Sequence, residues 1–302
     1  MLSSKYEAKS SITEPTKNII CILAPNPSPM TFKGTNTYII DNNQLAIIDP
    51  GPLNEEHFNN ILQVIAGRQV KYIFLTHSHI DHSPLAKQVS EEFSAPIYGY
   101  GTSKTGLSPT MLSLIENGYD SGSEGIDYEF KPHFLIENGD KFELDNKMIS
   151  AIHTPGHMGN HVCFQFEEIL FSGDHVMGWA TSMVSPPYGD LTQFMASCRL
   201  LQNQEFSMFL PGHGDPVKNP SERLNFLINH RLERELQIKE TIKATPLNAL
   251  EITEIVYTDI DKSLIPAATR NVFAHLIDLS ERGLVSFHGK INEKSKARLN
   301  KK

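Results

Sequence analysis

Three histidines and an aspartate follow an apolar run in one short stretch of the chain, Thr76-His77-Ser78-His79-Ile80-Asp81-His82-Ser83. On a helix, ligands that share an ion need i,i+4 spacing, whereas in an extended chain residues i and i+2 project the same way. His77 and His79 can therefore hold one metal ion at the end of a strand. Asp81 and His82 are then left to face another ion. The pattern predicts a metal site.

Three further blocks downstream each offer another ligand. They are His153-Thr154-Pro155-Gly156-His157, Phe171-Ser172-Gly173-Asp174 and Pro211-Gly212-His213-Gly214. In each block an apolar strand leads into a turn that contains glycine, and then into an imidazole or a carboxylate. Both groups are hard or borderline metal ligands. The four blocks together make the metal prediction specific.

In this ordered set of blocks, the chain resembles the metallo-β-lactamase superfamily over nearly all of its length. The resemblance implies an α/β fold, namely an αββα sandwich whose loops hold two metal ions at one edge. It implies that His77, His79 and His157 bind the first metal, that Asp81, His82 and His213 bind the second, and that Asp174 bridges them. Zinc is the expected metal, although iron or manganese would accept the same ligands. A hydroxide shared by two metals would form near neutral pH and attack the substrate.

Other residues are expected to support this centre. Metal-bound imidazoles need hydrogen-bond acceptors behind them, and Asp49, which follows an early apolar run, matches the superfamily's supporting aspartate. The loop Gly34-Thr35-Asn36-Thr37 is expected to face the site. For His161 and His175 two interpretations stay open: each orients a ligand or donates a proton to a leaving group, or each is a core histidine. The residues expected to carry catalysis are Asp81, His82, Asp174 and His175.

The composition favours a soluble enzyme. The 302 residues include 39% hydrophobic and 9% aromatic residues, enough for one large domain and a small one. No apolar stretch approaches the ~20 residues that span a bilayer, and residues 1–18 show neither a secretory signal nor a typical transit peptide. Cys21, Cys163 and Cys198 are scattered without a CxxC pair, which fits a reducing compartment. We therefore expect a cytoplasmic protein with no membrane partner.

The chain divides into two parts near Val217. Before it, short β-rich runs alternate with helical stretches in an α/β pattern; the runs are 36–41, 44–49 and 71–76, and the helices 55–67 and 84–93. We expect a catalytic domain over residues 1–216 and a smaller domain over residues 217–302. The glycine-rich segment 99–131 resembles an insertion, part helix around 110–117 and part flexible loop. It either shapes substrate access or is a plain surface excursion.

From Pro220 onward the pattern turns helical. Apolar residues at helical spacing predict helices over 221–244, 250–258 and 265–282, and a short strand follows at 284–287. The basic residues that come next are Lys290, Lys294, Lys296, Arg298, Lys301 and Lys302. Helices followed by a strand and a basic tip predict a winged-helix-like domain. Residues 1–216 carry 12 Lys and Arg against 24 Asp and Glu, a net −12, whereas residues 217–302 carry 15 against 11, a net +4.

The C-terminal part of the chain indicates a particular group within the superfamily. With Asn26–Thr31, Gly34–Tyr38, Ser185-Pro186-Pro187 and Arg231–Glu235, the chain is similar to the β-lactamase-like group that has a C-terminal winged helix. That group includes bacterial metallo-hydrolases of unassigned substrate and a mitochondrial endoribonuclease that acts on single-stranded RNA. The chain departs from the latter at His175 and at Ser83-Pro84, where many members have Ser-Gly-Gly. These departures leave the substrate open.

Three functions are compatible with these residues. The first is a dinuclear, zinc-dependent hydrolase of a small or medium ester, thioester or lactone. The second is an endoribonuclease whose basic C-terminal domain holds single-stranded RNA. The third is a nucleic-acid-binding scaffold with an inert hydrolase fold, which is disfavoured because no ligand is missing. We favour the hydrolase, in which the C-terminal domain serves packing or formation of a homodimer.

Three other activities of the superfamily fit the chain less well. A β-lactamase of this kind usually has a cysteine where Asp174 stands. A glyoxalase II-like thioesterase shares the ligands, but its C-terminal glutathione-binding region has no clear match here. A persulfide dioxygenase would need one iron rather than two zinc ions.

Overall fold

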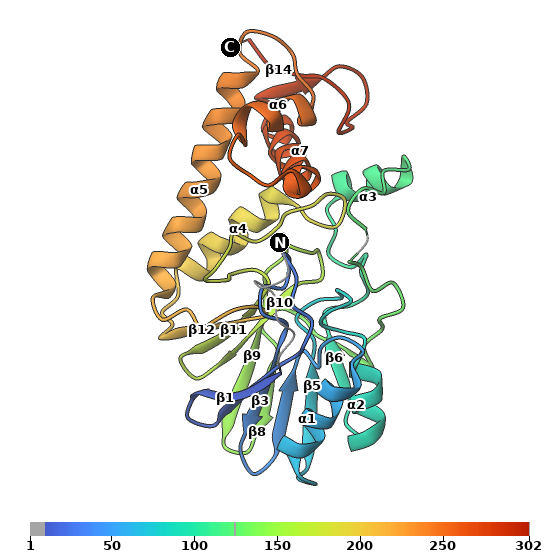
Figure 1. Ribbon diagram of the computed structural model, residues 1–302, viewed down its shortest axis with the longest axis vertical. Coiled ribbons are helices and arrows are strands. Elements are labelled where there is room, and N and C mark those ends of the chain that lie inside the picture. The colour runs from blue at the N-terminus through green and yellow to red at the C-terminus, as the bar shows by residue number, and fades with distance from the viewer. Residues whose placement is uncertain (1–9, 124, 302) are drawn as a thin grey trace.

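A computed structural model describes residues 10–123 and 125–301 of the chain. Two β-sheets pack face to face, helices lie on their outer sides, and a mostly helical domain stands at one end (Figure 1). Residues 1–9, half of the N-terminal segment in which no targeting signal is expected, lie outside the described residues, as does Glu124 in the expected insertion. None of the helices described combines the length and the apolar character that crossing a bilayer requires.

The first sheet has seven strands that lie side by side in chain order. They are β1 (Ser11–Thr16), β2 (Ile19–Leu23), β3 (Asn36–Asp41), β4 (Leu45–Ile48), β5 (Val70–Phe74), β6 (Ile97–Gly99) and β7 (Phe134–Leu135). Strands β1 to β4 pair antiparallel, whereas β4, β5 and β6 pair parallel. Parallel neighbours need a crossover, which α1 (Glu55–Ile65) and α2 (Ala86–Phe93) supply. The chain therefore leaves β4 and β5 at the same edge of the sheet.

The second sheet has five strands. In order across the sheet they are β12 (Met208–Pro211), β11 (Ile169–Gly173), β10 (Val162–Phe166), β9 (Lys147–His153) and β8 (Lys141–Leu144). β11 and β12 pair parallel and are joined through α4 (Leu191–Gln202). β9 also runs parallel to β11, because both pair antiparallel with β10. The chain therefore leaves β9, β11 and β12 at one common edge.

Three apolar layers hold the sheets and helices together. Tyr38 and Phe74 belong to the layer between the two sheets. Ile39, the next residue after Tyr38, belongs to the layer that packs the first sheet against Phe58 of α1, as the alternation of a pleated strand requires. Phe194 of α4 lies in the third layer, on the outer side of the second sheet. These layers confirm the expected αββα sandwich.

The C-terminal domain contains three α-helices, a short 3-10 helix and a small antiparallel sheet. The elements are α5 (Pro220–Thr241), α6 (Ala249–Val256), the short 3-10 helix η1 (Lys262–Leu264), α7 (Ile265–Glu281), β13 (Val285–Phe287) and β14 (Ala297–Leu299). α6 starts with a capping box, in which Asn248 Oδ1 accepts from the Glu251 N–H at 2.9 Å and the Glu251 carboxylate accepts from the Asn248 N–H at 2.8 Å. This arrangement confirms the predicted winged-helix-like domain.

The helix α5 contributes to both halves of the molecule. Leu224 and Leu227 in its first half pack with α4 of the sandwich, whereas Ile238 packs with α6 and α7. The predicted helices over 221–244, 250–258 and 265–282 are α5, α6 and α7, with ends moved by at most three residues. A domain boundary near Val217 stays a prediction, because the helix that follows it belongs to both cores.

The segment 99–131 is also attached to the C-terminal domain. Its helix α3 (Pro109–Glu116) buries Met111 and Leu114 in the core that surrounds Phe273 of α7. Beside this contact, the Tyr119 hydroxyl donates to Glu293 Oε2 at 2.7 Å. The segment is therefore packed between the two halves of the molecule, and it is not a plain surface excursion.

Candidate metal centre

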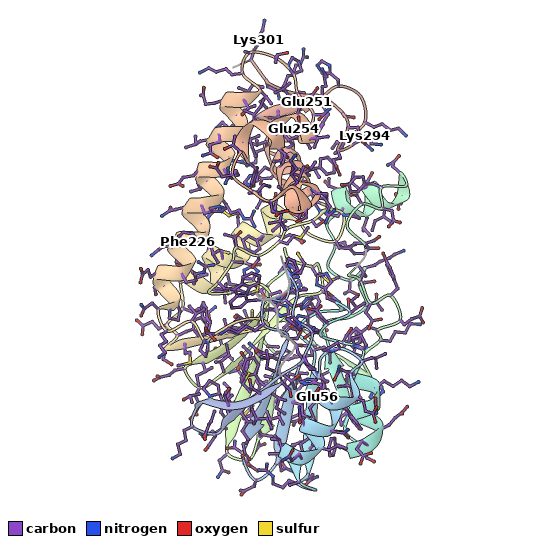
Figure 2. All side chains as sticks on the ribbon, in the orientation of Figure 1. Glu56, Phe226, Glu251, Glu254, Lys294 and Lys301 are labelled. Atoms are coloured by element: carbon purple, nitrogen blue, oxygen red, sulfur yellow. The ribbon has the colours of Figure 1, made fainter. Side chains whose placement is uncertain are left out.

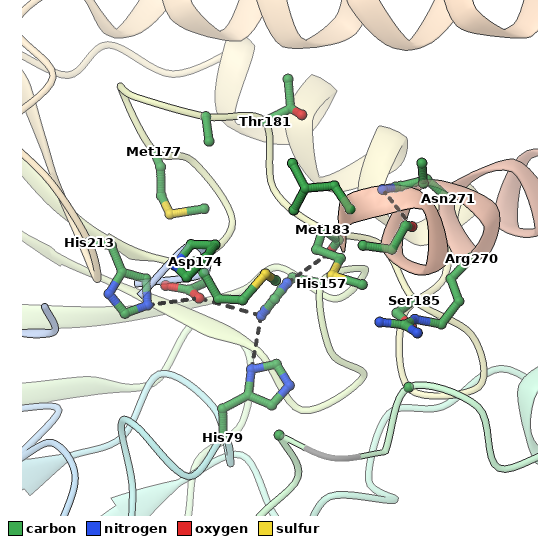
Figure 3. A pocket seen from close by; sticks show the side chains of 18 of the residues that line it. His79, His157, Asp174, Met177, Thr181, Met183, Ser185, His213, Arg270 and Asn271 are labelled. Carbon is green, nitrogen blue, oxygen red and sulfur yellow. Dashed lines mark hydrogen bonds and ion pairs between the residues drawn. The ribbon is translucent and has the colours of Figure 1, made fainter. Parts of the chain in front are cut away.

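The side chains singled out from the sequence meet at one edge of the sandwich, where the chain leaves β4, β5, β9, β11 and β12. The ligand atoms of His77, His79, His157 and Asp174 lie within 4.8 Å of one another, and so do those of Asp81, His82 and His213. The structure therefore brings together all seven residues that were expected to bind metal. Figure 3 shows four of them, His79, His157, Asp174 and His213, on one side of a cavity.

Asp174 lies between the two groups. Its Oδ2 atom is 3.6 Å from His157 Nε2 and 3.3 Å from His213 Nε2, and its Oδ1 atom is 3.5 Å from His82 Nε2. Oδ1 is buried and has no hydrogen-bond partner among the residues that the structure describes. A carboxylate in this position can reach an ion in either group, which is the geometry that a bridging ligand needs.

Hydrogen bonds behind two imidazoles determine which ring nitrogen faces the centre. His157 Nδ1 lies 2.8 Å from the carbonyl oxygen of Met183, and His213 Nδ1 lies 3.1 Å from that of Gly34. A carbonyl oxygen can only accept, so each Nδ1 carries the hydrogen and donates it. In both rings Nε2 is therefore the nitrogen that faces the centre.

Asp49, at the end of β4, orients two more imidazoles. Its carboxylate accepts from the backbone N–H of Thr76 at 2.7 Å, from the Thr76 hydroxyl at 2.7 Å and from His82 Nδ1 at 2.9 Å. Because the Thr76 hydroxyl donates to Asp49, its oxygen accepts from His77 Nδ1 at 2.9 Å. Asp49 thus occupies the supporting position expected from the sequence. The part of Thr76 was not predicted, although Thr76 stands directly before His77.

The nitrogens that face the centre lie close together. His77 Nε2 is 2.8 Å from His79 Nδ1, which is 3.1 Å from His157 Nε2, and His82 Nε2 is 3.3 Å from His213 Nε2. When Nδ1 of a ring donates its hydrogen to a group behind the centre, Nε2 of that ring has a lone pair. Two such nitrogens that face each other would place their lone pairs in contact. Lone pairs at these distances need a proton or a cation between them. Imidazole and carboxylate ligands suit divalent ions such as zinc, so the residues present fit the expected metals.

Burial and charge divide the imidazoles into two classes. Burial lowers the pKa of His77 well below its ordinary value and the pKa of His79 to about 3. Burial acts in the same direction on His82 and His213, but the carboxylates around these two rings outweigh it. They hold the pKa of His82 well above its usual value and raise the pKa of His213 to about 10. His77 and His79 are therefore neutral, which is the form that binds metal. His82 and His213 carry a proton that has to leave before a metal ion can bind.

Glycines in the downstream blocks leave room for the ligands. A Cβ on Gly212 would collide with Asp174 Oδ1 and would lie 2.6 Å from His82 Cε1. Gly173 has a φ of +48°, and a Cβ there would lie 2.6 Å from His161 Nε2. No side chain fits at either position without displacing a residue of the centre.

The loop Gly34–Thr37 lies against the centre, as the sequence predicts. The Thr35 hydroxyl is 3.5 Å from Asp81 Oδ2 and accepts from Asn26 Nδ2 at 2.9 Å. Asn36 Nδ2 donates to the carbonyl oxygen of Pro211 at 3.0 Å, which ties this loop to the strand that precedes His213.

The two ambiguous histidines lie in different places. The His161 ring is 5.2 Å from that of His77, and its Nδ1 is 2.9 Å from the Thr154 hydroxyl, so it is buried directly behind the centre. His175 is buried against the Phe194 ring at 4.6 Å, with Nε2 3.6 Å from Cys198 Sγ. His175 is not among the residues that line the cavity. Its position does not support the predicted catalytic role and fits the alternative of a core histidine.

A cavity of about 540 Å³ opens onto the centre. The candidate ligands form one side of it, and the loop after Asp174 contributes Met177, Trp179 and Met183. The far wall belongs to the C-terminal domain, with Arg270 and Asn271 of α7 among its residues (Figure 3). Gly122, Gly125 and Ile126 of the segment 99–131 also line the cavity. The sequence did not predict this shared wall, since no local pattern signals a contact between segments so far apart.

Comparison with known proteins agrees with this architecture. Residues 30–213 match the Metallo-beta-lactamase superfamily, and residues 249–294 match the Beta-lactamase associated winged helix domain. The chain is 31% identical to Beta-lactamase-like protein 2 homolog of Drosophila melanogaster, covering 90% of this chain and 91% of the relative. It is 27% identical to an atrochrysone carboxyl ACP thioesterase of Paecilomyces divaricatus, with coverages of 89% and 82%.

Two solved structures have the same fold. A beta-lactamase domain protein from Burkholderia ambifaria superposes with a TM-score of 0.78 at 19% identity, covering 99% of this chain and 96% of that one. A metallo-beta-lactamase family protein from Thermus thermophilus gives a TM-score of 0.74 at 20% identity, with coverages of 94% and 99%. With a family match over more than half of its residues, this chain belongs to the metallo-beta-lactamase superfamily and carries the associated C-terminal winged helix domain.

Proposed function

We propose that this member of the superfamily is a dinuclear, metal-dependent hydrolase that acts on a small, largely apolar acyl thioester. The observation that carries the proposal is the position of two adjacent groups of candidate metal ligands at one side of a cavity. Its volume of about 540 Å³ lies in the range of small-molecule sites. Met177, Met183 and Trp179 give much of the wall an apolar character.

The seven ligands suggest how two ions would be shared. His77, His79 and His157 would hold one ion, Asp81, His82 and His213 the other, and Asp174 would contact both. Zinc is the ion we propose first, with iron or manganese as alternatives. When bound, the ions would lower the pKa of water to about 7 and polarise the carbonyl of the substrate. The role of the protein is to fix the ligands: Asp49 and the carbonyl oxygens of Gly34 and Met183 prevent the imidazoles from turning.

The cavity lining contains few acidic side chains, and this favours a thiol as the leaving group. In the part that the structure describes, Asp81 and Asp174 are the acidic residues of the lining, and both are candidate ligands. Burial lowers the pKa of His230 and raises that of Tyr188, so neither donates a proton readily near pH 7. A thiol of pKa about 8.5 leaves as a thiolate without such a donor, whereas an alkoxide needs one. The thioesterase name of one relative agrees with this preference.

Cleavage of single-stranded RNA stays an alternative prediction. Lys294 and Lys301 lie at the end of the C-terminal domain that points away from the sheets (Figure 2). Lys296 pairs with Glu251 at 3.8 Å, and Lys290 donates to Asn117 Oδ1 at 3.2 Å. None of these lysines lines the cavity. A homodimer and a nucleic-acid-binding scaffold without activity also stay predictions that no contact described here favours.

Metal analysis and a substrate panel test the proposal. We expect two metal ions per chain, and hydrolysis of acyl N-acetylcysteamine thioesters at least about 10-fold faster, in kcat/KM, than that of the matched oxygen esters, because the missing proton donor affects only the latter. Lactones and single-stranded RNA complete the panel. A reproducible content of one iron and no zinc would contradict the dinuclear centre. Cleavage of RNA without turnover of any thioester would contradict the substrate class.

A further inference from the structure

One side of the cavity carries a positive group that the proposed chemistry does not use. Arg270 projects from α7 of the winged helix domain into the cavity, on the side away from Asp174 and His213 (Figure 3). Its Nε atom is buried and has no hydrogen-bond partner among the residues that the structure describes. Within the same described residues, no carboxylate lies within 4.0 Å of its guanidinium group.

Ser185 stands beside this arginine. A Cβ on Gly122 would collide with Ser185 Oγ and would lie 2.9 Å from Arg270 Cδ and 3.0 Å from Arg270 Nε. The hydroxyl and the guanidinium stem therefore converge over Gly122, which has no side chain to separate them. Ser185 Oγ is also buried without a hydrogen-bond partner in the described part of the chain. Two donor groups with unused hydrogens thus face one point of the cavity wall.

The neighbouring cation of the cavity is in a different state. Arg231 is 3% exposed, donates to Asn271 Oδ1 at 3.0 Å and donates to the carbonyl oxygen of Ser182. These bonds commit its guanidinium to the structure of the wall. Arg231 Nε is also buried without a partner, but the other two guanidinium nitrogens of Arg231 are bonded to the wall, whereas the guanidinium of Arg270 has no hydrogen-bond or ion-pair partner among the described residues. A buried donor without an acceptor is costly, and a charged one more so.

We propose that Arg270 and Ser185 form an oxyanion subsite that recognises a carboxylate or phosphate group of the substrate, at a distance from the bond that is cleaved. The planar guanidinium donates two parallel hydrogen bonds to such a group, and these charge-assisted bonds are stronger than neutral ones. Resting on the thioesterase function proposed above, this assigns an amphiphilic substrate: an apolar body along Met177 and Met183, with an anionic end on the winged helix domain.

Two pairs of thioesters distinguish the two sources of the anion. The first pair is the N-acetylcysteamine thioester of suberic acid and its terminal carboxamide, which places the charge on the acyl chain. The second pair is octanoyl-4′-phosphopantetheine and octanoyl-pantetheine, which places it on the thiol. The subsite can accept the anion from only one end of the substrate, so we expect a preference in one of the two pairs. In that pair the wild-type protein should prefer the anionic member by about 10-fold or more in kcat/KM, the typical effect of a charge-assisted hydrogen bond.

The variants of the subsite make the assignment specific. Arg270→Ala should remove the preference, chiefly through a higher KM for the anionic member, so that the two members of the pair have similar kcat/KM. Arg270→Lys should keep part of the preference because it keeps the charge. Ser185→Ala should weaken it by about 3-fold, as expected for one neutral donor. Arg282→Ala is the matched control, since Arg282 follows the last residue of α7 but pairs with Glu235 and Asp278 outside the cavity.

Either of two results overturns the subsite: no charge preference in both pairs, or an equal loss for both members in Arg270→Ala. A protein that hydrolyses no thioester would instead disprove the proposed function. In that event, titration calorimetry with the non-hydrolysable thioether analogues of the same four compounds decides the matter. Binding of an anionic analogue that is about 10-fold tighter and depends on Arg270 supports the subsite. Equal binding of charged and neutral analogues rejects it.

Discussion

Asp49 Oδ2 accepts a hydrogen bond from His82 Nδ1 at 2.9 Å, and this contact fixes the direction in which His82 presents its other nitrogen. The same carboxylate accepts two bonds from Thr76. An early turn residue therefore controls two imidazoles that follow a different strand. Its backbone φ of +51° lies in the left-handed region, which asparagine also tolerates.

Replacing Asp49 by asparagine should weaken metal binding without a change of backbone. An amide has one oxygen for three donors, so at least one of them loses its partner. We expect metal affinity to fall by about 10- to 100-fold, the usual effect of removing a group that orients a ligand. Competition with a metal chelator measures the change. Asp215→Asn, which breaks only an exposed pair with Lys33, should keep the wild-type affinity.

Removing a ligand of the second group should abolish turnover and preserve the fold. We expect His82→Ala and Asp81→Ala to lower kcat by at least about 100-fold, because the second ion supplies part of the chemistry. Circular dichroism and elemental analysis accompany the kinetics. Near wild-type activity together with full metal content in either variant would show that the second group has been assigned wrongly.

Gly212→Ala should disturb the centre by steric collision, without straining the backbone. The backbone at Gly212 is not in the left-handed region, yet a Cβ would meet Asp174 Oδ1 and lie 2.6 Å from His82 Cε1. We expect metal content to fall below two ions per chain, and activity to fall with it. Gly125→Ala is the matched control, since its Cβ would make an ordinary contact of 3.7 Å with His79. Full metal content in Gly212→Ala would mean that the centre is less tightly packed than described.

Stability should fall as the pH rises above 9. Burial raises the pKa of Cys21, Cys163 and Cys198 to about 12, each from an ordinary value of 9.0. A pKa raised by folding contributes stability that is complete below the unfolded-state value and is lost as the pH rises toward the folded-state value. The loss is at most about 1.4 kcal/mol per pH unit for each thiol.

Urea unfolding at pH 8, 9.5 and 10.5 measures this slope, and a variant with alanine at all three cysteines should show a smaller one. At pH 8 the native thiols should also resist alkylation, since burial keeps them protonated. Rapid alkylation of the native protein would show that the three side chains are more accessible than the structure indicates.

The sequence predicted which side chains would meet at this edge of the sandwich, because each of them comes shortly after a strand. His77, Asp174 and His213 each follow an apolar run and a short turn, and parallel strands deliver such turns to one edge. The role of His175 could not be read in this way. It follows Asp174 in the chain, but its ring is turned into the core against Phe194, and side-chain direction in a turn depends on packing.

The opposite wall of the cavity could not be predicted for a similar reason. Arg270 has its place there because α7 packs on α3 through Phe273 and Met111, and because α5 carries the domain back over α4. These contacts join residues far apart in the chain. The spacing of apolar residues predicted that α7 exists and where it begins and ends. It could not predict which surface α7 packs against, because that depends on the segment 99–131 and on other residues far away in the chain.

The two sides of the cavity come from different parts of the chain. The candidate ligands come from the loops between β4 and β12 and from the turn after β12, whereas the far wall includes residues of α7, a helix that contributes no candidate ligand. A substitution on α7 alters which molecules fit while the ligand set stays unchanged. Under the proposed function, a changed residue on the winged helix side would therefore change the substrate that is accepted and leave the candidate ligands in place.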